Sequence, residues 1–238
     1  MCNLKRMRSE DVPTVRALDL FATMSDDSFD RLIHGAFLQW FPPQVTLIEE
    51  GGSADFLHIV VEGLVELTAE GNGRETTMAI AAPVSAFILA AVLRDACYLM
   101  SARTLERSRV LMIPAERVRE AMRRDAAFAQ AIVRDLAGAF RTAVKSLKSH
   151  KLRTGVERLA NWLLVAHDRQ GATGRLSLPV EKRTLAALLG MTPENLSRAF
   201  ATLQRHGVEV SGRQIALTSL DDLRAFARPH RLIDDEQS

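Results

Sequence analysis

Residues 181–217 read EKRTLAALLGMTPENLSRAFATLQRHGVEVSGRQIAL, and this stretch decides the fold of the C-terminal part of the chain. It predicts a short helix that ends at Gly190 and a second helix that begins after Thr192, with Pro193 at its first position and the threonine hydroxyl available as a cap. Two helices joined by a tight glycine-containing turn form a helix-turn-helix motif. After Gly207, two strand patterns around a Ser-Gly-Arg turn predict the hairpin of a winged helix.

The second helix has two chemically different faces. Apolar side chains repeat at i, i+4 and i+7, whereas the opposite face carries Glu194, Ser197 and Arg198. In the DNA major groove, an arginine can bind guanine O6 and N7 together and a glutamate can accept from cytosine N4, each contact adding about 1–3 kcal/mol of discrimination. The alternative is a surface ion pair between Glu194 and Arg198, which is worth only about 0.2–0.5 kcal/mol at this spacing.

The C-terminal third of the chain is basic, although the whole chain has a formal charge of only +2. Residues 141–213 carry a net charge of +8, and the rest of the chain carries −6. This asymmetry suits a nucleic acid or another polyanion, and a solvated basic helix is the plainer alternative. With DNA as partner, side chains around the second helix are expected to contact phosphates, which position a protein without specifying sequence. The candidates are Lys182, Arg183, Thr192, Arg205 and Arg213.

Residues 125–150 contain no proline and predict one long helix. Two apolar stripes run along it, and each advances by three or four residues, which is the spacing of a coiled-coil seam. A helix that lies on its own domain uses one stripe, so the other predicts a parallel homodimer; burial of both in one large domain is the alternative. The seam assigned to the dimer contains Ile132, Leu136, Ala139 and Ala143, and the second stripe contains Val133, Ala137, Phe140, Val144 and Leu147.

Before the long helix, the pattern changes from helical to β. Residues 1–37 show apolar side chains at helix-like intervals, whereas short alternating stretches follow from Trp40 onward. Gly71-Asn72-Gly73 is a good hairpin turn because both residue types tolerate positive φ. The strands predict a small antiparallel sandwich or barrel, so the chain has an α+β fold in three parts: residues 1–124, 125–150 and 151–238. The last five residues read as a frayed acidic tail.

Composition excludes several classes of protein. The 238 residues are 47% hydrophobic and 25% charged, which excludes a wholly disordered or collagen-like chain. Cys2 and Cys97 stand alone, so no disulfide framework or cysteine-rich metal site is expected, and a reducing cytoplasm is the natural location. The start lacks the apolar core of a secretory signal, and the uncharged stretch at 78–93 is shorter than the roughly 18–20 residues of a membrane span. No catalytic motif or metal-ligand spacing appears, so we expect no enzyme.

In its motifs, the chain resembles the CRP/FNR family of transcriptional regulators over nearly its whole length. Glu194-x-x-Ser197-Arg198 carries the E-x-x-S-R signature of the FNR branch. The resemblance implies a jelly-roll sensor of the cyclic-nucleotide-binding type, a dimerisation helix and a winged helix-turn-helix. It also implies a DNA site of two-fold symmetry with half-sites similar to TTGAT. The sensor segments similar to the family's strand-turn pattern, with one extra residue, are Ile48-x-x-Gly51, Ala54-Asp55-Phe56 and Gly63-x-Val65.

The sensor lacks the phosphate cassette of the cyclic-nucleotide binders that it resembles. In that family, a Gly-Glu pair and a following Arg-Ser or Arg-Thr pair hold the cyclic phosphate. The corresponding stretch, Phe87 to Leu99, contains neither pair, and a buried phosphate without such partners is very costly. We therefore predict no response to cAMP or cGMP. A pocket for a small apolar effector is one interpretation of this region, and simple core filling is the other. The pocket candidates are Val84, Phe87, Ile88, Tyr98 and Leu99.

The sequence was also searched for residues that could support other kinds of sensor: an iron–sulfur cluster, haem or a reactive thiol. An FNR-type iron–sulfur cluster needs more cysteines than the chain has. His58 and Cys97 are conceivable axial ligands for haem, but a strand histidine without a paired ligand spacing is more often structural, so no cofactor is predicted. If Cys97 is exposed, thiol chemistry becomes a further option.

These features lead to two hypotheses from different classes. The main one is a homodimeric, sequence-specific DNA-binding regulator, an activator that touches RNA polymerase and has no membrane partner. The alternative is a ligand- or redox-sensing module whose C-terminal domain binds a protein partner. Salt dependence separates them, because phosphate contacts give a steep negative slope of log K against log salt. In the first hypothesis, an effector changes how the 125–150 helices pack and so the distance between two recognition helices.

Overall fold

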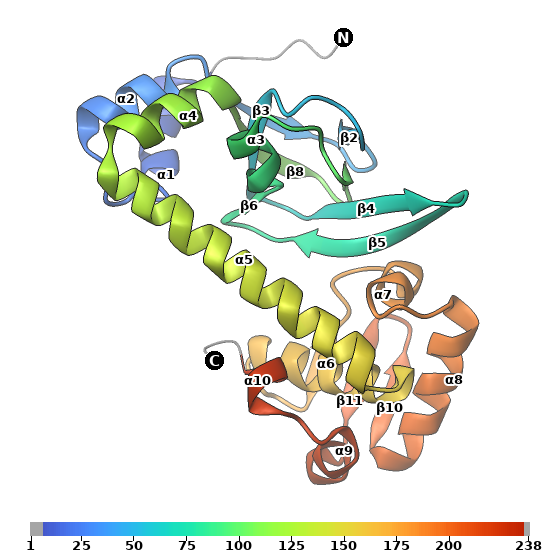
Figure 1. Cartoon of the computed structure of the whole chain (residues 1–238). Helices are drawn as coiled ribbons and strands as arrows, with labels where there is room; N and C mark the ends of the chain where they lie inside the picture. The colour runs from blue at the N-terminus through green and yellow to red at the C-terminus, as the bar shows by residue number, and fades with distance from the viewer. Residues whose placement is uncertain (1–6, 236–238) are drawn as a thin grey trace. The chain divides into compact units, whose positions relative to one another are not determined.

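The structure is a computed structural model, and it describes residues 7–235. The chain forms two compact units, one ending at Ala139 and the other beginning at Phe140. Their boundary lies inside α5, Ala126–Leu152, which is a single continuous helix of 27 residues (Figure 1). The sequence predicts this helix at 125–150 as a part of its own. In the structure it belongs to both units, because Phe128, Ala131 and Ile132 are buried in the N-terminal one.

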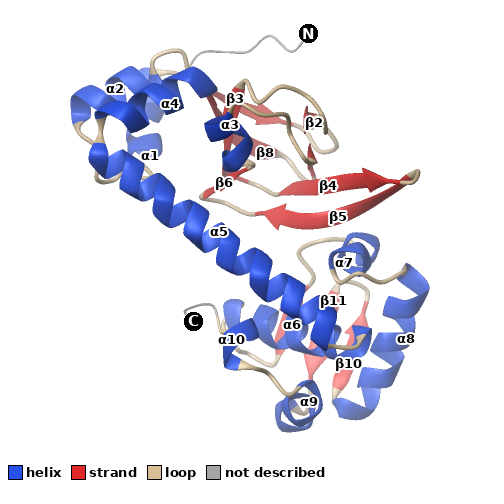
Figure 2. Ribbon diagram, in the orientation of Figure 1, coloured by secondary structure: helices blue, strands red, loops and turns tan. Residues whose placement is uncertain are grey.

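Two four-stranded antiparallel sheets form the frame of the N-terminal unit (Figure 2). Their strand orders are β1-β8-β3-β6 and β2-β7-β4-β5, so strands distant in sequence are paired, as in a jelly roll. Side chains of both sheets share one apolar core, in which Leu57, Val65 and Leu111 are fully buried. The predicted antiparallel sandwich is therefore confirmed. The strands are β1 Phe37–Phe41, β2 Thr46–Ile48, β3 Phe56–Glu62, β4 Val65–Gly71, β5 Arg74–Ala81, β6 Ser85–Phe87, β7 Ser101–Thr104 and β8 Ser108–Pro114.

Two turns of this unit depend on residues that tolerate a left-handed backbone. The β4–β5 hairpin turns at Asn72 and Gly73, with φ of 53° and 70°, which confirms the predicted hairpin. Gly63, between β3 and β4, has a φ of 88°, and a Cβ there would lie 2.4 Å from the Ser108 hydroxyl oxygen. No side chain fits at Gly63, which explains the glycine in the strand-turn pattern.

Short helices cover the sheets of the N-terminal unit. The helical pattern predicted over residues 1–37 appears as three short segments, and it stops before Phe37 because β1 begins there. The first six residues, including Cys2, lie outside the described residues. The helices are η1 Ser9–Asp11, α1 Val12–Arg16, α2 Asp26–Ile33, α3 Leu89–Arg94 and α4 Ala115–Arg124.

Asp125 joins the start of α5 to the start of α2. One carboxylate oxygen accepts from the Phe128 amide at 2.9 Å, three residues into the helix, as an N-cap does. The other oxygen accepts from the Ser25 amide and hydroxyl at 3.1 and 3.0 Å. The Phe128 amide, aided by Ser25, lowers the pKa of the Asp125 carboxyl to about 2. Ionised Asp125 therefore stabilises the fold above the ordinary carboxyl pKa, and this stabilisation is lost as the pH falls from about 3.8 to about 2.

Asp125→Ala is expected to lower the free energy of unfolding at pH 7 by about 2 kcal/mol, because the helix loses its cap and Ser25 loses a charged acceptor. Asp125→Asn keeps a neutral acceptor for Phe128 and should lose roughly half as much. Urea unfolding followed by circular dichroism measures both values. Equal stability of Asp125→Ala and the natural protein would show that the junction is not a cap.

The C-terminal unit is a winged helix-turn-helix with a three-stranded sheet of order β10-β11-β9 (Figure 2). Helix α6 starts with a capping box, in which the Thr154 hydroxyl accepts from the Glu157 amide and the Glu157 carboxylate accepts from the Thr154 amide. The predicted helix, turn, helix and hairpin are all present. The elements are α6 Gly155–Arg169, β9 Arg175–Ser177, α7 Lys182–Leu188, α8 Pro193–Leu203, η2 Gln204–His206, β10 Val208–Ser211, β11 Gln214–Leu217, α9 Leu220–Ala227 and α10 Arg231–Asp234.

The prediction of a frayed acidic tail is wrong at Asp234. Asp234 ends the short helix α10, and its carboxylate forms an ion pair with Arg153, with both side chains largely buried. This contact could not be predicted from the sequence because Arg153 and Asp234 are 81 residues apart. Residues 236–238 lie outside the described part of the chain.

Candidate nucleic-acid interface

Helix α8 presents the predicted base-reading residues to solvent. Glu194, Ser197 and Arg198 are exposed. On the opposite face, Leu196, Phe200 and Leu203 are 2%, 6% and 0% exposed, so this face holds the helix in the unit. The Thr192 hydroxyl accepts from the Asn195 amide at 3.3 Å and caps the helix, as predicted. A rigid, capped helix with a polar outer face has the geometry of a groove-reading element.

The carboxylate of Glu194 is held in its ionised form. Its own backbone amide, then the Thr192 hydroxyl and the charge of Arg198, lower the pKa of the Glu194 carboxyl. Within residues 7–235, no ion pair at 4.0 Å or less joins Glu194 to Arg198, although the guanidinium is near enough to favour the carboxylate. Glu194 is therefore available as an acceptor and Arg198 as a donor for another molecule.

The turn before α8 is fixed by contacts from two helices. Gly190 has a φ of 63°, and a Cβ there would lie 2.9 Å from the His150 ring of α5. Arg158 of α6 donates to the Leu189 carbonyl at 2.8 Å, and also to the Arg153 carbonyl at 2.8 Å. Sequence reasoning missed Arg158, because its partners are backbone carbonyls that leave no pattern of residue types.

The residues predicted to contact phosphates lie around α8, but they differ in whether their side chains already make hydrogen bonds within the protein. Lys182, Arg183 and Arg205 are exposed, and the Lys182 ammonium lies 5.8 Å from the centre of the Phe200 ring. Arg213, in the wing turn, donates to the Leu178 carbonyl at 3.2 and 2.9 Å. Its guanidinium thus fastens the wing with two of its five N–H groups and leaves the others for a phosphate. The Thr192 hydroxyl is engaged as the helix cap.

The dimer seam predicted on α5 needs correction. Ile132 is fully buried in its own unit and is not free for a partner, and the partly buried Leu136 packs against the same core. Four large apolar side chains of the second stripe are exposed instead: Val133 is 60%, Phe140 71%, Val144 40% and Leu147 55% exposed, and Leu152 at the end of α5 is 70% exposed. Ala139 and Ala143 are exposed beside them. The reason is local packing, since Phe128 stacks on Phe21 with ring centres 6.1 Å apart and turns the Ile132 side inward.

The five candidates for an effector pocket differ in burial. Val84 and Leu99 are 54% and 74% exposed, whereas Phe87 and Tyr98 are core residues and Ile88 is half-buried. The Tyr98 hydroxyl donates to the Phe56 carbonyl at 3.0 Å, which fixes its ring in the core. Phe87 and Tyr98 thus fit the alternative of core filling, whereas Val84 and Leu99 face solvent.

The conceivable haem ligands lie in different environments. His58 is 5% exposed and packs against Phe87, with ring centres 5.5 Å apart. Cys97 is an exposed free thiol in an isolated bridge with Ser53. Within residues 7–235, no group of three or more metal-ligating side chains gathers, and no helix is long and apolar enough to cross a membrane.

Two protein families match the chain in sequence. Residues 38–125 match the cyclic nucleotide-binding domain, and residues 157–226 match the Crp-like helix-turn-helix domain. No curated protein matches the chain.

Several solved structures share its fold. A Ruegeria pomeroyi protein, provisionally described as cyclic nucleotide binding, is 28% identical with a TM-score of 0.61, and the match covers 94% of this chain and 100% of that one. FixK2 from Bradyrhizobium japonicum is 24% identical with a TM-score of 0.69, covering 80% and 96%. A Eubacterium rectale protein, provisionally described as a CRP/FNR-family regulator, is 19% identical with a TM-score of 0.71, covering 88% and 98%. With a sensor domain, a long helix and a Crp-like helix-turn-helix in this order, the chain belongs to the CRP/FNR family of DNA-binding transcription regulators, which are not enzymes.

Proposed function

We propose that the protein is a homodimeric regulator that binds a palindrome with half-sites similar to TTGAT, and that Glu194, Ser197 and Arg198 read the bases. The observation that carries this proposal is the polar outer face of α8, exposed while its apolar face is buried. Donor, acceptor and hydroxyl stand at the N-terminal half of the helix, where a recognition helix meets base edges. Lys182, Arg183, Arg205 and Arg213 surround it and are suited to phosphates.

Arg198→Ala is expected to weaken binding to the TTGAT-like palindrome by about 1–3 kcal/mol, roughly five- to 150-fold, because a bidentate contact to guanine is lost. Binding to a scrambled duplex should not change. Fluorescence anisotropy with labelled duplexes at fixed salt measures both affinities. Equal loss on the two duplexes would contradict base reading by Arg198.

Arg205→Ala is the matched control, since Arg205 is also an exposed arginine beside α8. As a phosphate contact it should weaken both duplexes alike and reduce the slope of log K against log salt by about 1. If the natural protein and both variants, Arg198→Ala and Arg205→Ala, show no salt-dependent affinity for DNA, the result favours the alternative of a C-terminal domain that binds protein.

The proposed dimer uses the exposed stripe of α5. Val133, Ala137, Phe140, Val144 and Leu147 advance by four, three, four and three residues, the heptad spacing of a two-stranded coiled coil. The large apolar side chains of this stripe are exposed in the single chain, and a contiguous exposed apolar surface indicates contact with a partner. By two-fold symmetry a second copy presents the same stripe, so the occupant we propose is a second copy of this chain. The roles of activator and of RNA polymerase contact are proposed from the family alone.

We also propose that cAMP is not the effector. Tyr98 and Leu99 stand where an arginine and a serine or threonine would be expected, and the Tyr98 hydroxyl is used by the Phe56 carbonyl. Titration with 1 mM cAMP is expected to change neither the melting temperature nor the affinity for the palindrome, because Tyr98 and Leu99 cannot hold the cyclic phosphate as an arginine and a serine or threonine would. A ligand-dependent rise in melting temperature would contradict this, since any ligand of the native state raises it.

A further inference from the structure

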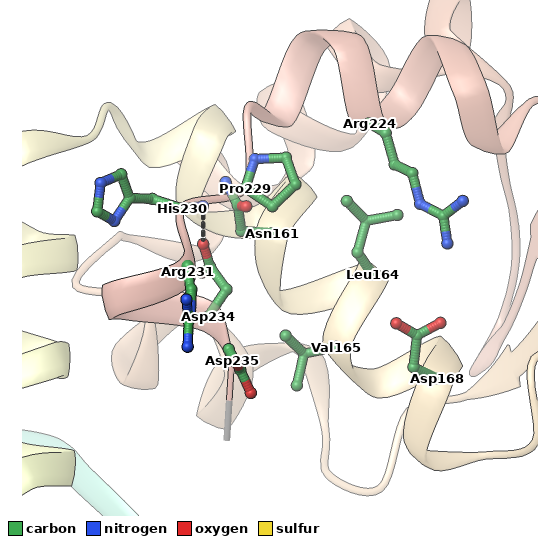
Figure 3. A pocket seen from close by; sticks show the side chains of 10 residues that line it. All are labelled: Asn161, Leu164, Val165, Asp168, Arg224, Pro229, His230, Arg231, Asp234 and Asp235. Atoms are coloured by element: carbon green, nitrogen blue, oxygen red, sulfur yellow. Dashed lines mark hydrogen bonds between the residues drawn. The ribbon is translucent and has the colours of Figure 1, made fainter. Parts of the chain in front are cut away.

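The C-terminal segment, residues 230–235, lies against α6 and the last turns of α5 (Figure 3). It includes α10, and the Leu232 amide donates to the His230 ring at 3.2 Å at the start of that helix. Two lysines of α5 hold its backbone: Lys145 donates to the Asp235 carbonyl at 2.6 Å and Lys148 to the Leu232 carbonyl at 3.4 Å. All these contacts lie within the C-terminal unit.

The strongest contact of the segment is between Arg153 and Asp234. Two guanidinium nitrogens donate to the two carboxylate oxygens at 2.7 and 2.5 Å, and the side chains are only 8% and 15% exposed. Asp234 also accepts from the His230 amide at 2.6 Å. A bidentate, charge-assisted pair of this kind fixes geometry as well as adding energy. Removing one partner leaves a largely buried charge without compensation.

Arg153 stands at the corner between α5 and α6. It follows Leu152, the last residue of α5, and precedes Thr154, the cap of α6. Its carbonyl accepts from Arg158, which also donates to the Leu189 carbonyl in the turn before α8. Through Arg158, Arg153 is therefore two hydrogen bonds away from the turn that precedes α8.

The segment and α6 line an open pocket of about 210 Å³. Figure 3 shows Leu164 and Val165 of α6 facing this space, with Pro229 above them. The buried Asn161 side-chain oxygen at this cavity has no hydrogen-bond partner. Leu232 of the segment is 56% exposed. The segment is thus attached mainly by its polar contacts, and the Arg153–Asp234 pair is the one with the best geometry.

We propose that residues 230–235 form a strap that locks the α5–α6 corner, with Arg153 and Asp234 as positioning residues for the recognition helix. This inference rests on the proposed two-fold DNA binding. Two recognition helices must match half-sites about one helical turn, roughly 34 Å, apart. A locked corner sets the direction of α8 relative to α5 before DNA binds. Binding to a full site then carries no entropy cost for fixing this direction.

The experiment compares Asp234→Asn with the natural full-length protein on a duplex with two half-sites and on a duplex with one. We expect the ratio of full-site to half-site affinity to fall about tenfold or more, while half-site affinity changes less than about twofold. Hydrogen exchange of the amides of residues 152–158 should become at least about tenfold faster. Arg153→Lys keeps the positive charge but loses the two guanidinium nitrogens that bind both carboxylate oxygens, so it should show an intermediate effect in both assays.

Asp221→Asn is the matched control, because Asp221 is an exposed aspartate of α9 and should leave both readouts unchanged. The charge swap R153D/D234R should recover part of the hydrogen-exchange protection. Unchanged protection in Asp234→Asn would overturn the strap, and faster exchange with an unchanged affinity ratio would overturn its positioning role. If the natural protein binds neither duplex, the proposed function fails, while hydrogen exchange still decides whether the strap locks the corner.

Discussion

Phe140→Glu is expected to weaken dimerisation at least about a hundredfold. Phe140 is 71% exposed in the single chain and lies in the middle of the exposed stripe of α5. Burying a phenylalanine side chain contributes about 1.5–3 kcal/mol, and two-fold symmetry counts it twice, so the dimer loses about 3–6 kcal/mol. Two like charges facing each other at the seam add to this loss. Sedimentation velocity over a range of protein concentrations measures the dissociation constant.

The same substitution should spare the fold, because the side chain it removes is mostly outside the core. Thr142→Glu, at an exposed polar position of the same helix, serves as the control and should leave dimerisation nearly unchanged. Loss of the dimer should also abolish the preference for a full palindrome over a half-site. A Phe140→Glu protein that remains dimeric at micromolar concentration would show that α5 is not the interface.

His58→Leu is expected to remove about 3 kcal/mol of pH dependence from the stability of the N-terminal unit. Burial lowers the pKa of His58 to about 4, from an ordinary value of 6.5, because the ring lies among aromatic side chains. Between these pH values the unfolded chain binds a proton that the folded protein does not. Stability is therefore complete above about pH 6.5 and falls as the pH drops to about 4, by about 1.4 kcal/mol per pH unit.

Urea unfolding at pH 7.5 and at pH 4.5 measures this dependence. The natural protein should lose more stability than His58→Leu over this interval, because leucine binds no proton. His34→Gln, at an exposed histidine, should keep the slope of the natural protein. Parallel curves for His58→Leu and the natural protein would mean that His58 is protonated in the folded state.

The helix-turn-helix could be predicted from sequence in detail because its signals are local. A cap, a proline, a glycine and an apolar repeat all fall between residues 190 and 207, and the structure puts α8 and its buried face where they indicate. The hairpin at Asn72 and Gly73 is a second case, since its turn chemistry needs no distant partner. Where backbone geometry within one element decides the outcome, the residue types are sufficient.

The two apolar stripes of α5 show where such reasoning stops. The periodicity of α5 correctly shows two apolar stripes, but it contains nothing that says which one packs inward. That choice depends on Phe21 and Phe128, which are far apart in the chain and stack in the core. The segment around α3 is a related case, because it places Val84 and Leu99 at the surface and Phe87 and Tyr98 in the core. A list of apolar residues does not distinguish these directions.

By itself, the sequence determined the order of the parts, the strands and turns, the chemistry on the outer face of α8 and the absence of a phosphate cassette, because these follow from residue types at short spacing. Only the tertiary structure decided which stripe of α5 is free, that Arg158 ties α6 to the turn before α8, and that Asp234 pairs with Arg153. These contacts join residues 31 to 81 positions apart, or a side chain to a carbonyl. Such pairings depend on where folding brings the chain, and no local spacing encodes them.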